Sequence, residues 1–96
     1  MRMKNKVVLI SGAARGLGAS QAEMFAKEGA SVIVGDIRTS EGNEVVARIK
    51  SAKGQALFAY LDVTDANSWK QCVSRGITTF GKIDVLVNNA GITATG

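Results

Sequence analysis

A glycine-rich turn near the start of the chain constrains its fold more than any other feature. Residues 7–10 (Val-Val-Leu-Ile) form a β-branched apolar run that predicts a buried strand. Residues 11–18 (Ser-Gly-Ala-Ala-Arg-Gly-Leu-Gly) follow, and then a helical pattern that should place Leu17, Ala22 and Phe25, with Ala26, on one apolar face. The glycines therefore lie where a strand passes into a helix.

This position predicts an anion site. Gly12, Gly16 and Gly18 lack a Cβ, so they permit tight backbone angles and the close approach of another molecule. The free N–H groups and the dipole of the first helical turn favour negative charge. We expect the turn to bind phosphate, and most specifically the pyrophosphate of a dinucleotide.

Strands and helices are predicted to alternate through the rest of the chain. Strands are expected at residues 7–11, 31–36, 56–61 and 84–88. The first helix should cover residues 16–28 and end at Gly29. The second should be capped by Thr39 or Ser40 and end at Gly54, and the third capped by Thr64 or Asp65 and ended by Gly81.

Polar residues close three of the predicted strands at a regular interval. Asp36, Asp62 and Asn88 are 26 residues apart, which indicates a repeating strand–helix unit. Such alternation predicts an α/β fold of the Rossmann type, with flanking helices, a parallel sheet and right-handed crossovers. We expect strand order 3-2-1-4, with a ligand crevice at the carboxyl ends of strands one and four.

Asp36 predicts how the sugar of a dinucleotide is recognised. It lies 24 residues after Gly12, near the spacing expected for a ribose-binding carboxylate. A carboxylate accepts hydrogen bonds from ribose hydroxyls and repels a 2′-phosphate, which favours NAD over NADP. Arg15 and Arg38 leave the alternative open, because a guanidinium can pair with a 2′-phosphate or remain a solvated charge.

Two further strand ends offer polar groups to the same edge. Asp62 can accept a hydrogen bond from the adenine amino group and Val63 can contact the ring, although Asp62 can instead help to start the next helix. Asn88 and Asn89 can cap the crevice with amide groups or simply form a turn.

Composition excludes several classes of function. The 96 residues suit a single domain, and 46% hydrophobic with 21% charged residues is ordinary globular composition, without a membrane-spanning run. The net charge of +4 is scattered, which argues against a nucleic-acid partner. The chain has no His and one cysteine, Cys72, so no metal site is expected and a reducing, cytoplasmic location is favoured.

Together these motifs resemble the short-chain dehydrogenase/reductase family. Its Thr-Gly-x-x-x-Gly-x-Gly motif corresponds to residues 11–18, with Ser11 in place of Thr, and its Asn-Asn-Ala-Gly motif to residues 88–91. The resemblance implies hydride transfer between a nicotinamide and an alcohol or carbonyl substrate. The implied cofactor-binding residues are Gly12, Ala14, Arg15, Gly16, Leu17, Gly18, Asp36, Asp62, Val63, Asn88, Ala90 and Gly91.

The family's catalytic Ser, Tyr and Lys have no counterpart in this chain. Its one tyrosine, Tyr60, has Thr64 rather than Lys four residues on, and is expected to be a packing residue. The resemblance thus implies that residues 1–96 are one partial, amino-terminal nucleotide-binding domain of a longer, homo-oligomeric enzyme, inactive alone. A non-catalytic NAD- or adenosine-binding module is the alternative, and an open apolar edge at residues 85–87 would favour self-association.

Overall fold

Strands and helices alternate along the chain, as the sequence predicts. The structure is a computed structural model that describes residues 2–89, so the predicted site residues Ala90 and Gly91 lie outside the described residues. The elements are β1 (Val7–Ser11), α1 (Gly16–Lys27), β2 (Ser31–Asp36), α2 (Thr39–Ser51), β3 (Gln55–Tyr60), α3 (Ala66–Phe80) and β4 (Val85–Asn88).

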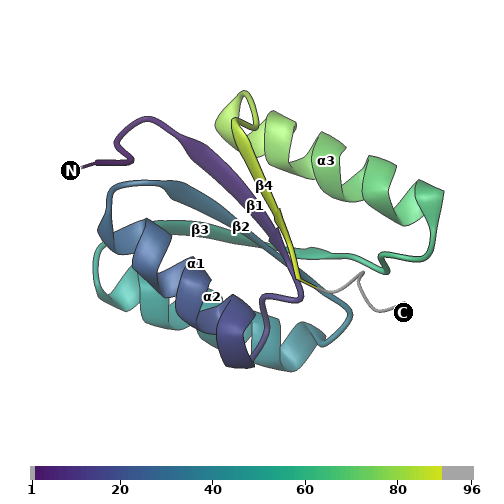
Figure 1. Cartoon of the computed structure of the whole chain (residues 1–96), viewed down its shortest axis with the longest axis horizontal. Coiled ribbons are helices and arrows are strands. Elements are labelled where there is room, and N and C mark those ends of the chain that lie inside the picture. Colours follow the sequence, from purple (N-terminus) through teal and green to yellow (C-terminus); the bar gives the residue numbers. More distant parts are fainter. Residues whose placement is uncertain (1, 90–96) are drawn as a thin grey trace.

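The four strands form one parallel sheet in the order β3-β2-β1-β4, which confirms the predicted Rossmann-type topology. Helices α1 and α2 cover one face of the sheet and α3 covers the other (Figure 1). Strands β1 and β2 are therefore buried on both faces, which is why their sequences are continuous apolar runs rather than alternating ones.

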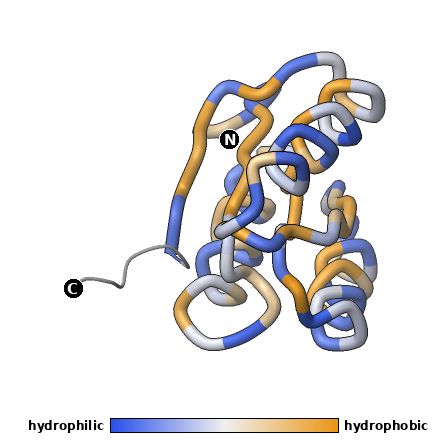
Figure 2. Tube along the Cα trace, turned by 90° about the vertical axis from the view of Figure 1, so that its right-hand side faces the viewer, coloured by the Kyte–Doolittle hydropathy of each residue, from blue (hydrophilic) through white to orange (hydrophobic). Residues whose placement is uncertain are grey.

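Two apolar clusters hold these layers together. Alternate strand residues point to opposite faces, so Val8 and Ile10 join the cluster under α1 and α2, while Val7 and Leu9 join the cluster under α3. Strand β4 is hydrophobic along most of its length and runs along one side of the sheet (Figure 2). Leu86 in this strand is 54% exposed.

The helix termini confirm some predicted caps and correct others. The side chain of Asp65 caps α3 by accepting from the N–H of Asn67 at 2.9 Å, and Gly81 ends that helix with φ of 90°. The cap predicted for α2 is wrong, because Thr39 is already helical and Arg38 precedes it without a side-chain cap. Helix α2 also ends at Ser51, before Gly54, because Lys53 adopts the left-handed conformation.

Two side chains lie in surroundings other than those predicted. Leu17 is 69% exposed, and α1 instead buries Gly18, Ala19 and Ala22, because Gly18 rather than Leu17 faces the end of β1. Tyr60 is 56% exposed at the end of the edge strand β3, so its interpretation as a packing residue is wrong. Among the described residues, no helix is long and apolar enough to cross a membrane.

Strand β1 and helix α1 meet at a contact that leaves no room for a side chain. A Cβ added to Gly18 would overlap the carbonyl oxygen of Gly12 and lie 2.9 Å from the Cα of Ala13. Gly18 therefore lets the first turn of α1 lie directly against the end of β1.

The start of β4 is tied to the start of β1 by a carboxylate. The backbone N–H of Asp84 donates to the carbonyl of Val7 at 2.8 Å, and Asp84 Oδ2 accepts from the N–H of Val7 at 2.8 Å. The same oxygen is 3.1 Å from Lys82 Nζ. The Val7 hydrogen bond, followed by the interaction with Lys82, holds the pKa of Asp84 below its ordinary value.

The Asp84→Asn variant should be less stable than the unsubstituted chain at neutral pH. A carboxylate with a lowered native pKa contributes stability above its ordinary pKa and loses this contribution as the pH falls through the native value. The difference should therefore begin to decrease near pH 4 and disappear only below the lowered native pKa of Asp84. Urea unfolding across the acid range measures it, with the exposed Glu44→Gln as the control. A difference that persists in acid would contradict the assignment.

The Gly18→Ala variant should lose about 3 kcal/mol of unfolding free energy, because its Cβ meets rigid backbone rather than a flexible side chain. Gly16→Ala is the matched control: φ is 61° there, so a side chain is strained by about 1 kcal/mol, but nothing lies within 4 Å of its Cβ. Urea denaturation of both variants checks the order, and equal losses would show that the contact is unimportant.

Candidate functional site

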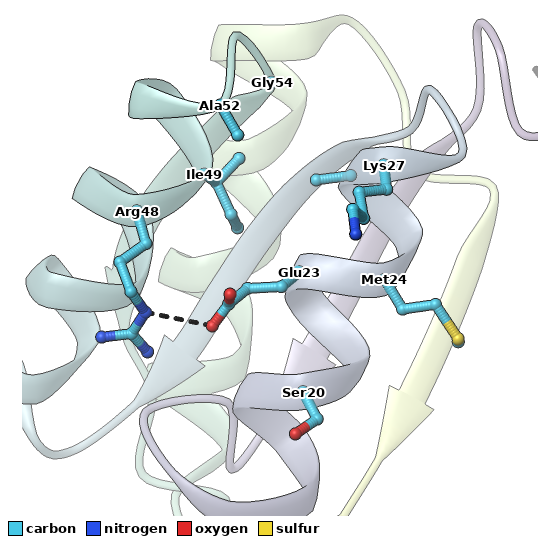
Figure 3. A pocket seen from close by; sticks show the side chains of 9 residues that line it. Ser20, Glu23, Met24, Lys27, Arg48, Ile49, Ala52 and Gly54 are labelled. Carbon is cyan, nitrogen blue, oxygen red and sulfur yellow. Dashed lines mark hydrogen bonds and ion pairs between the residues drawn. The ribbon is translucent and has the colours of Figure 1, made fainter.

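A hollow of about 400 Å³ lies between α1 and α2, but its chemistry does not mark it as the site (Figure 3). It lies beside the C-terminal halves of both helices, away from the glycine turn at the start of α1. Glu23 and Arg48 pair with each other at 3.1 Å, and Lys27 is the other charged residue of the lining. Few polar groups therefore remain to orient a ligand there.

The glycine turn is held against the carboxyl end of β2. The N–H of Ala13 donates to the carbonyl of Gly35 at 3.1 Å, and the N–H of Ala14 donates to Asp36 Oδ2 at 3.0 Å. Gly12 and Gly16 have φ of 65° and 61°, a conformation that favours glycine. The space over Gly16 is open, so another molecule can approach the backbone there.

The start of α1 has no capping side chain and no acidic residue in its first turn. Arg15 precedes the helix in an extended conformation. The first N–H groups of a helix have no partner within it. An anion placed over Gly16 would be favoured by these groups and by the helix dipole.

Asp36 lies directly beneath the turn, at the carboxyl end of β2. It is 4% exposed. Besides the N–H of Ala14, it accepts hydrogen bonds at Oδ1 from the N–H of Arg38 at 3.0 Å and from Arg38 Nη1 at 3.3 Å. These donors compensate for burial of the carboxylate. Asp36 thus supports the turn and also brings an acid beside it.

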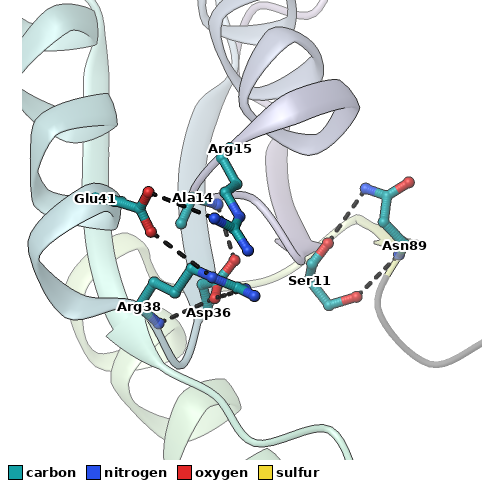
Figure 4. Close-up of polar contacts among 7 residues, drawn as sticks. All are labelled: Ser11, Ala14, Arg15, Asp36, Arg38, Glu41 and Asn89. Carbon is teal, nitrogen blue, oxygen red and sulfur yellow. Dashed lines mark hydrogen bonds and ion pairs between the residues drawn. The ribbon is translucent and has the colours of Figure 1, made fainter.

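Two ion pairs surround this carboxylate (Figure 4). Glu41, in the first turn of α2, faces both arginines of the predicted site: one of its oxygens is 3.8 Å from Arg15 Nη1 and the other is 3.7 Å from Arg38 Nε. Glu41 was not predicted from the sequence as part of the site. Glu41 lies three residues after Arg38, the residue that precedes α2. This spacing could have indicated the ion pair between Glu41 and Arg38.

The ends of β1 and β4 are joined by a second polar network (Figure 4). Ser11 Oγ donates to Asn88 Oδ1 at 2.6 Å and accepts from the N–H of Asn89 at 3.0 Å. Asn89 Nδ2 donates to Ser11 O and to Gln21 Oε1. The hydroxyl of Ser11 therefore ties the end of β1 to the end of β4, and Gln21 is a member of this network that was not predicted from the sequence.

Asp62 forms the turn that leads from β3 into α3. Its Oδ1 accepts from Thr64 Oγ1 at 2.6 Å and from the N–H of Thr64 at 3.0 Å, and these bonds, the hydroxyl first, lower the pKa of Asp62. The carbonyl of Val63 accepts from Trp69 Nε1 at 2.9 Å, and its half-buried side chain packs on the core under α3. Both residues thus have structural roles near the carboxyl edge.

The remaining chemistry-bearing residues form no second site. Within residues 2–89, no group of His, Cys, Asp or Glu is arranged to hold a metal ion. Cys72 is buried on the sheet-facing side of α3, and burial raises the pKa of its thiol to about 11. The structure thus brings together the glycine turn, Arg15, Asp36 and Arg38, while Asp62 and Val63 lie after the edge strand β3.

Comparison with known proteins agrees with this architecture. The family model described as short chain dehydrogenase matches residues 6–96. The chain is 50% identical over 91 residues to 2,5-dichloro-2,5-cyclohexadiene-1,4-diol dehydrogenase LinX from Sphingobium indicum, covering 95% of this chain and 36% of that protein. It is 46% identical over 101 residues to trans-4-hydroxycyclohexanecarboxylate dehydrogenase from Sinomonas cyclohexanicum, covering 99% and 39%.

A solved structure shares the same fold. The crystal structure of hydroxysteroid dehydrogenase from Escherichia coli superimposes with a TM-score of 0.92 at 39% identity, covering 97% of this chain and 40% of that one. The chain thus spans about two fifths of the length of the relatives it matches. Its sequence and its sheet topology agree, and the chain belongs to the short-chain dehydrogenase family.

Proposed function

We propose that this chain is the NAD-binding part of a short-chain dehydrogenase/reductase. The observation that carries the proposal is the Asp36 carboxylate, held beneath the glycine turn by the N–H of Ala14 at 3.0 Å. The pyrophosphate would lie over Gly12, Gly16 and the uncapped start of α1, with Leu17 exposed beside it. Asp36 would then accept hydrogen bonds from the adenine ribose.

The choice of NAD over NADP follows from charge. A 2′-phosphate carries close to two negative charges and would lie against the carboxylate that the ribose hydroxyls approach. Arg38, which could offset this repulsion, is already hydrogen-bonded to Asp36 through both its backbone and its guanidinium. The arrangement favours a ligand with free 2′- and 3′-hydroxyls.

The rest of the cofactor would follow the carboxyl edge. We assign adenine to Asp62 and Val63, and the central part of the crevice to Gly18, Asn88, Ala90 and Gly91. Residues 1–96 would form one partial dinucleotide-binding domain, since the chain spans about two fifths of its relatives. The single cysteine favours a reducing compartment, and we place the protein in the cytoplasm.

The whole enzyme would transfer hydride between the nicotinamide and an alcohol or carbonyl, as the dehydrogenase names of its relatives suggest, and it would assemble as a homo-oligomer. Neither nucleic acid nor a membrane is a proposed partner. This chain contains no Tyr-x-x-x-Lys sequence, and its only tyrosine, Tyr60, is the last residue of β3, at the opposite edge of the sheet from β4. A dinucleotide-binding module without catalysis is therefore the second candidate for the chain itself.

Calorimetry with NAD and NADP should show binding of NAD, with NADP at least about tenfold weaker because of repulsion by Asp36. Asp36→Asn should narrow this difference by removing the charge. Absence of heat with either dinucleotide would contradict the proposal, while stronger binding of NADP would contradict the role given to Asp36.

The 96-residue chain should not turn over NAD when incubated with a panel of primary, secondary and cyclic alcohols. It has no proton acceptor equivalent to the family's tyrosine to remove the hydroxyl proton as hydride leaves. Absorbance of NADH at its nicotinamide band checks this expectation against a sample without protein. Sustained NADH production above that background would refute the assignment of catalysis to the rest of a longer enzyme.

A further inference from the structure

Glu41 forms ion pairs with both arginines of the cofactor corner, by which we mean Arg15, Asp36, Arg38 and Glu41. Its two carboxylate oxygens are divided between them, 3.8 Å from Arg15 Nη1 and 3.7 Å from Arg38 Nε. Arg15 comes from the glycine turn and Arg38 from the loop after β2, so Glu41 links the two segments that border Asp36 (Figure 4).

The corner is balanced in charge. Asp36 and Glu41 supply two carboxylates, and Arg15 and Arg38 supply two guanidinium groups. Arg38 is held from two sides, by Asp36 Oδ1 at 3.3 Å and by Glu41 at 3.7 Å. Without Glu41, the same place would carry a net positive charge and one arginine without its acidic partner.

We propose that Glu41 is a positioning residue that disfavours NADP, by pairing with the guanidinium groups of Arg15 and Arg38 that a 2′-phosphate would need. The inference rests on the proposed function. A 2′-phosphate needs guanidinium partners to offset the charge of Asp36. To gain them it must first separate both pairs with Glu41. NAD has no such phosphate, so its binding leaves the pairs intact.

The pairs themselves add little to stability. Their side chains are between 40% and 61% exposed, and exposed ion pairs contribute little to folding. Loss of the Glu41 charge should therefore leave the fold intact and change ligand choice. A change in ligand choice without a change in stability distinguishes the proposed role of Glu41 from a role in folding.

The test compares two probes that differ only in the 2′-phosphate, adenosine 5′-monophosphate and adenosine 2′,5′-bisphosphate. Glu41→Gln should raise the affinity for the bisphosphate about three- to tenfold relative to the monophosphate. The gain should diminish at high ionic strength, because exposed charges are screened. Glu41→Asp, which keeps the charge, should retain most of the discrimination.

Glu44→Gln is the matched control, since Glu44 is an exposed acid on the same helix with no ion pair among the described residues. It should leave the ratio of affinities unchanged. An unchanged ratio in Glu41→Gln, or an equal change in Glu44→Gln, would overturn the role of Glu41 while NAD binding by the unsubstituted chain still stands. Failure of that chain to bind NAD or either probe would overturn the proposed function as well.

Discussion

The close backbone approach of Gly18 to Gly12 determines where the glycine turn and the start of α1 lie at the carboxyl edge of the sheet. Helix α1 can leave β1 so sharply only because no Cβ separates them. The approach places the uncapped start of the helix at the end of the sheet and exposes its N–H groups. It also brings Ala14 over β2, where its N–H reaches Asp36. The absence of a side chain at Gly18 thereby allows both the anion site and the hydrogen bond that brings Asp36 beside it.

The acid beneath the turn then determines the electrostatics of the site. A carboxylate that is almost fully buried needs donors, and two backbone N–H groups with one guanidinium supply them. Glu41 extends the arrangement to Arg15, so that the charges alternate across the corner. In our proposal, recognition of the sugar depends on all four charged side chains and not on Asp36 alone. Glu41 thereby affects the choice between NAD and NADP.

The edge of the sheet formed by β4 is held by hydrogen bonds to β1 and, within residues 2–89, is not covered along its length. Strand β4 is tied to β1 at its start by Asp84 and at its end by Ser11 and Asn88, but Leu86 between them is largely exposed. Among the described residues β4 has no neighbour beyond it. An apolar strand with an open edge offers a pairing surface, in keeping with a chain that covers two fifths of its relatives' length.

The sequence alone determined the strand order, most element boundaries and the family, because period, glycine positions and turn residues are local signals. It also predicted Asp65 as one of two candidate caps of α3, and the structure confirms Asp65. Only the tertiary structure decided the neighbours of each charge. Glu41 meets Arg15 across 26 residues of chain, Gln21 meets Asn89, and Leu17 turns outward from its helix. Such contacts depend on how helices pack on the sheet, and no local pattern records that packing.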